Sequence, residues 1–250
     1  VQCVKDMRFA GEAEVLRPWL LRALTEGWDR PGDLARVCAD VVKHAGDLTS
    51  DTLLLALLRL TPNLDIELEK RLTAARRDFL RDLVDGSEPG ALDFYSALAQ
   101  QCFINEYVFG HGEEEIAQAR ELRDKMISAF GTGAPVPATW LIAVAAYFPL
   151  GALPSAGRLL EKAWPAAVES ILTQQIREPQ EEQRLRASIV RLTEIADENS
   201  QAVQAQYEEN PYPRWVRAGT AEAQELGPYL RQAFPQAKIP VADFMLGCWG

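Results

Sequence analysis

The sequence predicts an all-α protein, an irregular array of antiparallel helical hairpins with a solenoid-like arrangement. Apolar residues recur at steps of three and four along most of the chain, which is the spacing of one face of an α-helix. The alternation typical of strands is almost absent until the last dozen residues. Breaks rich in glycine and proline separate segments of roughly 10–25 residues, so short loops are expected between successive helices. A clean period of about 34 residues is missing, so strict tetratricopeptide repeats are not indicated.

Helical patterns follow one another from the N-terminus. Asp33 is expected to cap the second helix, after Pro31 and Gly32. Pro165 is expected either to kink the helix over residues 156–177 or to begin it. The expected helices, in chain order, cover residues 17–26, 33–44, 52–60, 65–84, 91–109, 113–130, 140–148, 156–177 and 180–206.

The helix over residues 65–84 has the clearest two-sided pattern. Its apolar stripe consists of Ile66, Leu68, Leu72, Ala75, Phe79 and Leu83. The other positions mix acids with the arginines Arg71, Arg76, Arg77 and Arg81. Interspersed charges of both signs are typical of a face in water, so we interpret these arginines as solvated.

The character of the sequence changes after residue 206. Prolines interrupt the helical pattern there, and one short helix is expected over residues 220–234. Residues 238–246 then resemble a buried strand running into glycines, as at the opening of a doubly wound, Rossmann-like sheet. We therefore expect an α-helical domain over residues 1–206. Residues 207–250 are expected to form a linker, the short helix and the incomplete start of a second domain.

Composition and charge exclude several classes of protein. The chain is 48% hydrophobic, an ordinary globular value, and its formal net charge is −10. An acidic protein does not attract polyphosphates, so nucleic acid is not expected as a ligand. The first residues lack the apolar core of a secretory signal, and the longest nearly uncharged run, residues 139–149, is shorter than the roughly 20 residues that span a bilayer. The sequence predicts a soluble, cytoplasmic protein without membrane contact.

The residues that carry chemistry form no catalytic or metal-binding pattern. The four cysteines are widely spaced, and Cys38 and Cys102 are expected to be buried free thiols in helices. His44 and His111 lack companions at metal-ligand spacing, so no metal is expected. Walker, Gly-x-Ser-x-Gly and Cys–His nucleophile arrangements are absent from the sequence, so no residue is assigned a catalytic role.

The first candidate site is the segment around Asn105 and Glu106. Helical spacing places both residues close to the apolar stripe through Cys102, Val108 and Phe109. A carboxylate drawn toward a core needs a partner or a shifted pKa, which makes such positions functional candidates. The plainer alternative is a hydrogen bond from Glu106 to a neighbouring helix, and we prefer it because no second titratable partner stands out nearby.

The second candidate site is the segment over residues 207–215. Two prolines flank Tyr212, so its backbone is held extended and its ring is presented. Arg214 and Trp215 add a planar cation and a flat aromatic surface that could stack on a ligand ring or clamp a carboxylate. A rigid corner between two domains would need the same residues, and both interpretations stay open. The candidates are Tyr207, Asn210, Tyr212, Arg214 and Trp215.

Two segments together resemble a known group of bacterial proteins. They are Ala-Leu-Ala-Gln-Gln-Cys-Phe-Ile-Asn-Glu-Tyr-Val-Phe at residues 97–109 and Gln-Tyr-Glu-Glu-Asn-Pro-Tyr-Pro-Arg-Trp at residues 206–215. Both are similar to segments of class I S-adenosylmethionine-dependent methyltransferases with an N-terminal helical, tetratricopeptide-like region. The resemblance covers most of the chain from near Leu53 onward. It implies the first strand and Gly-x-Gly-x-Gly loop of a catalytic domain at residues 244–250.

The same resemblance bears on the cofactor. Glycines after a first strand let the backbone approach a ribose or phosphate, so it implies cofactor contacts from Gly247 and Gly250. Trp249 departs from the family pattern, which has its second glycine there. The later strands, the acid for the ribose hydroxyls and the substrate pocket are missing from these 250 residues. The resemblance therefore implies S-adenosylmethionine for full-length relatives and no bound cofactor for this chain.

The leading hypothesis is the helical N-terminal region of such a methyltransferase, without catalysis in a truncated chain. It would shape substrate access or recruit a partner, which is either another protein or a missing catalytic domain. The alternative is a stand-alone helical scaffold that binds proteins, and assembly into a homo-oligomer is compatible with both. A third hypothesis is a small-molecule pocket between helices around Tyr95, Glu106, Trp140 and Tyr147.

Overall fold

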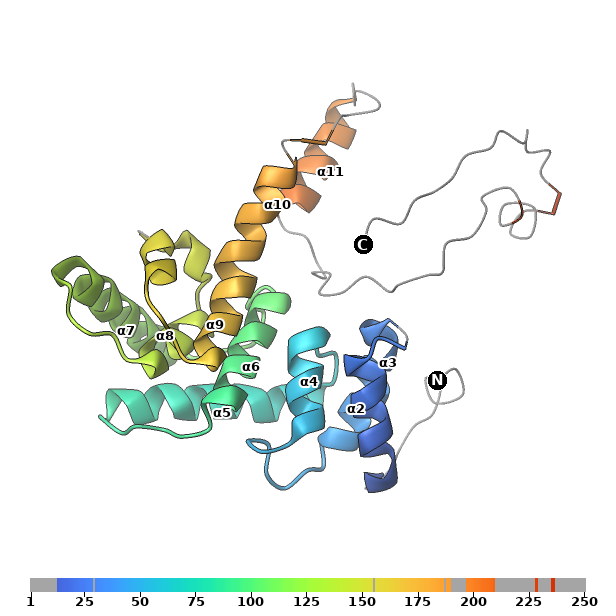
Figure 1. Ribbon diagram of the computed structural model, residues 1–250, viewed down its shortest axis with the longest axis horizontal. Coiled ribbons are helices and arrows are strands. Elements are labelled where there is room, and N and C mark those ends of the chain that lie inside the picture. Colours follow the sequence, from blue (N-terminus) through green and yellow to red (C-terminus); the bar gives the residue numbers. More distant parts are fainter. Residues whose placement is uncertain are drawn as a thin grey trace. The chain divides into compact units, whose positions relative to one another are not determined.

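All regular secondary structure in the described residues is helical. The computed structural model describes residues 13–28, 30–154, 156–186, 188–189, 197–209, 228 and 235–236. These residues contain no strand, which confirms the all-α class for this part of the chain (Figure 1). The chain divides into two compact units, Val1–Arg217 and Ala218–Gly250, and the helices named below belong to the first. The predicted short helix and strand after residue 209 lie outside the described residues, apart from positions 228 and 235–236.

The helices and shorter turns follow in chain order. The α-helices are α2 (Arg17–Thr25), α3 (Pro31–Val42), α4 (Thr52–Leu60), α5 (Ile66–Val84), α6 (Leu92–Ile104), α7 (Glu113–Thr132), α8 (Ala138–Ala145), α9 (Ala166–Leu172), α10 (Glu178–Arg186) and α11 (Glu198–Glu209). The short 3₁₀ turns are η1 (Glu14–Leu16), η2 (Leu150–Ala152) and η3 (Ala156–Glu161), and η4 (Thr173–Arg177) is a π-helical turn.

Aspartate caps begin two of the best predicted helices. The Asp51 carboxylate accepts hydrogen bonds from the backbone N–H groups of Leu53 and Leu54, both at 3.1 Å, at the start of α4. The Asp65 carboxylate accepts from Leu68 N at 2.9 Å at the start of α5. Each cap satisfies N–H groups that the first turn of a helix leaves without a partner. Helix α4 therefore begins at the predicted residue, and α5 begins one residue after the predicted start because Asp65 is its cap.

Asp33 does not cap α3, contrary to the prediction. The helix begins two residues earlier, at Pro31, with Arg30 in the extended N-cap conformation, and Asp33 lies in the first turn. Proline suits a first helical position because its missing N–H has no partner there and its φ is already helical. An aspartate in the first turn is still favourable, since it faces the positive end of the helix dipole.

The C-terminal helices differ from the prediction. Residues 156–161 form a 3₁₀ turn, and Pro165 is the N-cap of α9, so the proline begins a helix and does not kink one. Helix α9 then continues through η4 into α10 without a break. The predicted continuous helix over residues 180–206 is wrong, because residues 188, 189 and 197 are not helical.

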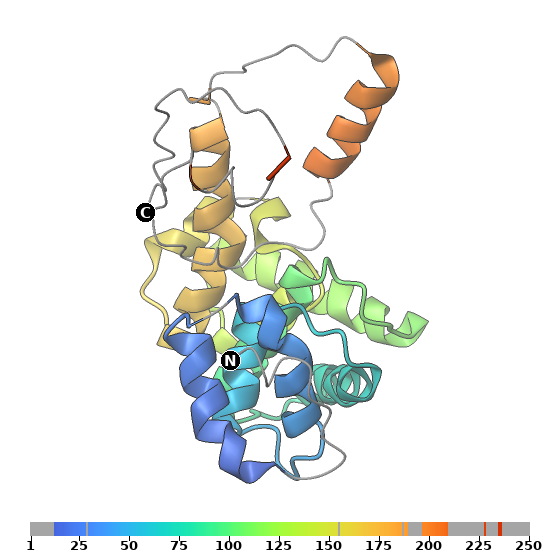
Figure 2. The same ribbon diagram turned by 90° about the vertical axis from the view of Figure 1, so that its right-hand side faces the viewer.

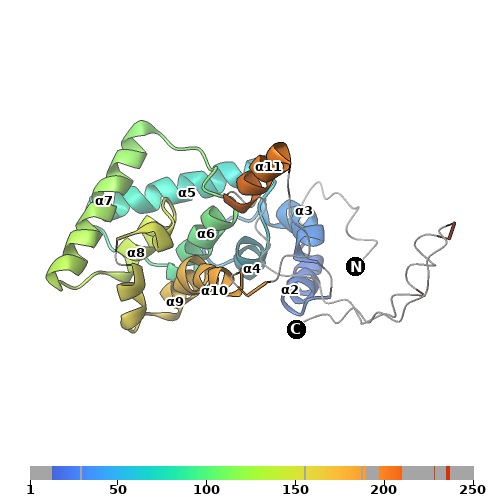
Figure 3. The ribbon, with the colours of Figure 1, turned by 90° about the horizontal axis from the view of Figure 1, so that it is seen from above.

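Helix α6 connects the two groups of helices in the first unit. It contacts α4, α5, α8 and α9, and α4 in turn contacts α2 and α3 (Figure 3). Helices α5, α7 and α8 contact one another on the other side of α6. From Ser96 to Ile104 every residue of α6 is buried. Each large apolar side chain contributes roughly 1.5–3 kcal/mol to stability when it is buried. Helix α6 therefore contributes strongly to the stability of the core.

Candidate functional site

The predicted segment around Asn105 ends α6 with a sharp turn. The helix stops at Ile104, five residues before the predicted end, because Glu106 and Tyr107 take left-handed φ angles of 56° and 58°. Such a conformation costs roughly 1–3 kcal/mol for a residue other than glycine. The turn is held by hydrogen bonds from Tyr107 N to Cys102 O at 2.8 Å and from the Tyr107 hydroxyl to Ala145 O at 3.3 Å.

The structure separates the two residues predicted at this site. Asn105 is 2% exposed, and neither polar atom of its side-chain amide has a hydrogen-bond partner. Glu106 is half-buried and does not enter the core as a buried carboxylate. The neighbouring Gln101 is fully buried and, with its amide turned, donates to Thr61 O at 2.8 Å and accepts from Asn63 N at 3.2 Å. The segment therefore contributes mainly to the packing between helices.

A buried ion pair, which the sequence did not predict, lies beside this segment. Arg76 of α5 donates through Nη2 to Glu115 Oε1 at 3.1 Å and to Gly110 O at 2.8 Å. The Tyr147 hydroxyl donates to the same Glu115 oxygen at 2.6 Å, and the Arg76 guanidinium lies 4.4 Å from the centre of the Tyr147 ring. The side chain of Arg76 is only 2% exposed, so the interpretation of this arginine as solvated is wrong.

The surroundings shift the pKa values of this network. Burial works to lower the pKa of Arg76, but Cys102, Tyr147 and Glu115 outweigh it and the pKa is raised. Burial raises the pKa of Tyr147, and it raises that of Cys102 to about 11 although the charge of Arg76 acts in the opposite direction. A tyrosine and a thiol that stay protonated, closed off from water, are poorly suited to acid–base catalysis near neutral pH. We conclude that the network stabilises the fold.

The π-helical turn η4 presents a second buried polar residue, Gln175. Its side-chain oxygen accepts from Leu150 N at 3.1 Å and from the Tyr107 hydroxyl at 3.5 Å, and its amide nitrogen donates to Ala145 O at 3.3 Å. Gly151 is required nearby, because a Cβ atom there would lie 2.8 Å from Gln175 O. π-Turns are frequent at functional sites, but here the turn joins the ends of α6, α8 and η2.

The third hypothesis, a pocket around Tyr95 and Tyr147, is not supported by the packing. The Tyr95 ring stacks on Phe79 at 3.9 Å, whereas Tyr147 lies under Arg76. Trp140 is half-buried against the core. The small apolar cavity beside Met126 and the larger polar cavity described next are lined by none of the four proposed residues.

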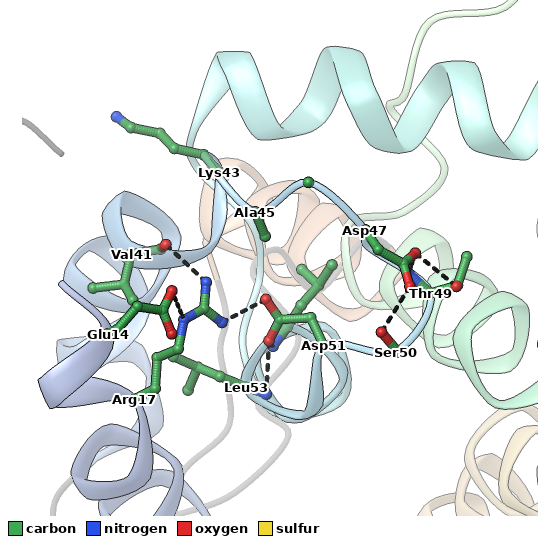
Figure 4. A network of polar contacts seen from close by, with 12 residues as sticks. Glu14, Arg17, Val41, Lys43, Ala45, Asp47, Thr49, Ser50, Asp51 and Leu53 are labelled. Atoms are coloured by element: carbon green, nitrogen blue, oxygen red, sulfur yellow. Dashed lines mark hydrogen bonds and ion pairs between the residues drawn. The ribbon is translucent and has the colours of Figure 1, made fainter. Parts of the chain in front are cut away.

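A polar cavity of about 330 Å³ lies where the end of α3 meets η1 and the start of α4 (Figure 4). Arg17 crosses it, donating from Nε to Glu14 Oε1 at 2.8 Å and from Nη1 to Asp51 Oδ2 at 2.6 Å. A third bond runs from Nη2 to Val41 O at 3.2 Å. The lining residues are Glu14, Arg17, Val41, His44, Ala45, Gly46, Asp47, Ser50, Asp51 and Thr52.

The charges around this cavity are fixed by local bonds. The Asp47 carboxylate accepts from Thr49 N at 2.8 Å and from the hydroxyls of Thr49 and Ser50, both at 2.7 Å. These bonds, that of Ser50 most of all, hold the pKa of Asp47 below its usual value. Burial works to lower the pKa of Arg17, but the Asp51 and Glu14 carboxylates outweigh it. Asp47 and Arg17 are therefore both charged at neutral pH.

The structure describes the backbone of only one of the remaining predicted residues. Tyr207 belongs to α11, and Asn210, Tyr212, Arg214, Trp215, Gly247 and Gly250 lie outside the described residues. In the part of the chain that the structure describes, no group of three His, Cys, Asp or Glu residues could hold a metal ion. The described helices also include none with the length and apolar character needed to cross a membrane.

Comparison with known proteins gives no relative. No family model matches the chain, and no curated protein or solved structure matches it either. Two residues of the polar networks, Asp51 and Arg76, lie at positions that a sequence pattern could have indicated. Asp51 directly precedes a leucine-rich run, as a helix cap does, and Arg76 falls at helical spacing between Leu72 and Phe79.

Proposed function

We propose that the helical unit is a binding module that docks another protein domain and does no chemistry of its own. In this proposal it is the N-terminal region of a class I methyltransferase, and its solenoid-like helices shape substrate access beside the catalytic domain. That domain would open with the Rossmann-like strand predicted over residues 238–246. The observation that carries the docking role is helix α10.

Helix α10 has no buried residue, although it directly continues the buried helix α9 (Figures 1 and 2). Leu185 near its end is 47% exposed and Ile189 is 71% exposed. The intrinsic helix propensity of nine residues stabilises an exposed helix only slightly. Helices in proteins are stabilised mainly by packing an apolar face against another surface. The exposed apolar residues support a second surface that covers α10.

The order of the segments in the chain favours the catalytic domain as the partner that covers α10. It follows α10 and α11 in the chain, so a domain that begins there is tethered close to this surface in sequence. The perturbed groups Arg76, Cys102 and Tyr147 are buried in the fold and line neither described cavity, which favours binding over catalysis.

Calorimetry with S-adenosylmethionine tests the absence of catalysis. We expect no saturable heat when the cofactor is titrated into the 250-residue protein at micromolar concentrations. The resemblance implies a glycine loop without the later strands, and a cofactor is bound across the ends of several strands. Binding in the micromolar range would overturn the proposal. The coding sequence beyond residue 250 gives the second test, since an open frame continuing into strand–helix repeats is expected.

The docking surface has a matched test. A catalytic domain expressed from that downstream frame should bind the 250-residue protein, and Leu185→Glu should weaken the complex about tenfold or more, because it places a charge in a desolvated contact. Val84→Glu is the control, since Val84 ends α5 and is 49% exposed, close to the value for Leu185. Equal affinities for the two variants would contradict docking on α10. A stable complex with an unrelated protein, without any cofactor affinity, would instead favour the stand-alone scaffold.

A further inference from the structure

The segment over residues 105–112 lies between the Arg76–Glu115 ion pair and solvent. It contacts both members of the pair, because Gly110 O accepts from Arg76 Nη2 at 2.8 Å and Gly112 N donates to Glu115 Oε2 at 3.4 Å. Arg76 and Glu115 are buried, whereas both glycines are exposed. The segment therefore covers the ion pair on one side. The docking role proposed for α10 makes no use of it.

At its first end the segment has an unfavourable backbone conformation. Glu106 N donates to Phe103 O at 3.2 Å. Tyr107 N donates to Cys102 O at 2.8 Å, which completes a Schellman motif, a helix end with one left-handed residue. Glycine is usual at that position, but here it is Glu106, and Tyr107 is left-handed as well. Two consecutive residues with side chains in this conformation destabilise the turn.

The Asn105 side chain destabilises the same turn. It is 2% exposed, and neither polar atom of its amide has a hydrogen-bond partner among the described residues. A buried amide without partners raises the free energy of the conformation that buries it. At the other end of the segment, an added Cβ atom at Gly110 or Gly112 would meet nothing within 4 Å. Side-chain packing therefore does not hold the chain at these two positions.

The main contacts that favour this conformation are made at Phe109 and Gly110. Phe109 is 1% exposed in the core, and Gly110 O accepts the charged hydrogen bond from Arg76. The apolar spacing of α6 continues through Val108 and Phe109, although Val108 is 64% exposed. The same residues are therefore compatible with a longer α6, in which the backbone strain is relieved and the two contacts are lost.

We propose that residues 105–112 form a gate over the Arg76–Glu115 ion pair, which opens when α6 extends through Phe109. Opening converts the two left-handed residues to helix and withdraws the Gly110 carbonyl from the guanidinium. Water then reaches the ion pair. The closed conformation is the major one, and the open conformation is a minor state of roughly 0.1–10% of the molecules.

The test measures the minor state directly, by ¹³C saturation-transfer NMR of the 250-residue protein. We expect one minor state whose Cα chemical shifts at Glu106 and Tyr107 are helical. Unfolded shifts at these two residues would mean local unfolding and would overturn the proposal. The absence of a minor state above about 0.1% would overturn it as well.

A pair of glycine variants separates the gate from a general change of stability. Glu106→Gly should lower the population of the open state about tenfold or more, because glycine relieves the strain of the closed state and weakens the helix of the open one. Ala91→Gly relieves the same strain at the other end of α6, where Ala91 is exposed and has a φ of 56°. It should leave the open population unchanged. An equal decrease in both variants would contradict the gate.

Thiol labelling with N-ethylmaleimide, followed by mass spectrometry, tests whether the gate admits solvent. Cys102 is buried beside Arg76, so its labelling should require the open state. It should react about tenfold more slowly in Glu106→Gly than in the wild type, in proportion to the open population. Cys38, buried in α3, is the internal control, and its rate should change little. Slowing of both thiols by the same factor would mean that labelling follows unfolding of the whole helical unit, and the gate would be wrong.

Discussion

Arg76 and Arg17 each bind a carboxylate from another helical element, but in opposite surroundings. Arg76 is 2% exposed and its network with Glu115 and Tyr147 is closed to water, whereas Arg17 is 18% exposed and borders an open cavity. A buried ion is stabilised only by its partners, while a partly exposed ion is also stabilised by solvent. The same type of ion pair is therefore closed off in the core in one region and borders an open cavity in the other.

The largest expected effect comes from removing Arg76. Arg76→Met should lower the free energy of unfolding by about 3–5 kcal/mol, because Glu115 would remain as a buried charge without its partner. Chemical denaturation followed by circular dichroism measures this change. The control is Arg77→Met, one residue along α5 with a side chain 57% exposed, which should change stability by less than about 0.5 kcal/mol.

A double variant checks the cause of that loss. Arg76→Met combined with Glu115→Gln should recover part of the stability, because the uncompensated charge is removed and the amide oxygen can still accept from the Tyr147 hydroxyl. If the double variant were as unstable as the sum of the two single variants, the network would act through packing and not through charge.

The second effect uses the two buried free thiols, Cys38 of α3 and Cys102 of α6. Burial raises the pKa of Cys38 to about 12 and that of Cys102 to about 11, the latter beside Arg76. An unfolded thiol releases its proton near pH 8.5, so above that pH the unfolded state loses a proton that the folded state keeps. Stability from each thiol is thus fully present below about pH 8.5 and lost as pH rises toward the folded pKa.

At pH 10 the loss from each thiol amounts to about 2 kcal/mol. The fall in unfolding free energy between pH 7 and pH 10, measured with a reductant present, should therefore be smaller by this amount in Cys38→Ala than in the wild type. Comparing each variant with itself at the two pH values removes the cost of the cavity that alanine leaves. A fall as large in Cys38→Ala as in the wild type would show that this thiol ionises freely in the folded protein.

Local sequence patterns explain which parts of the fold can be predicted from the sequence. Helix α4 begins at the predicted residue because Asp51 and the leucines after it carry the cap and the apolar face locally. The end of α6 is different. The apolar pattern continues to Val108 and Phe109, while the backbone turns left-handed at Glu106 and Tyr107. A hydrogen bond from the Tyr107 hydroxyl to Ala145 O of α8 supports this turn, and no local pattern encodes it.

The candidate sites were predictable to a smaller extent. The sequence predicts Asn105 close to the core, where the structure places it, but the charged neighbours of Arg76 predict a solvated side chain, and Arg76 is buried. Its burial depends on Glu115, which lies 39 residues further along the chain. The cavity around Arg17 likewise requires Asp51, 34 residues away. Spacing within one helix cannot show which distant carboxylate completes such a pair.

The smallest expected effect on stability is that of a substitution at the Arg17 cavity, and it contrasts with the large effect expected at the Arg76 network. Glu14→Gln should change the free energy of unfolding by less than about 0.5 kcal/mol, because Glu14 is exposed and Arg17 keeps its bonds to Asp51 and Val41. The same chemical denaturation as for Arg76→Met measures it. A loss above about 2 kcal/mol would mean that the Arg17 network supports the fold as the Arg76 network does.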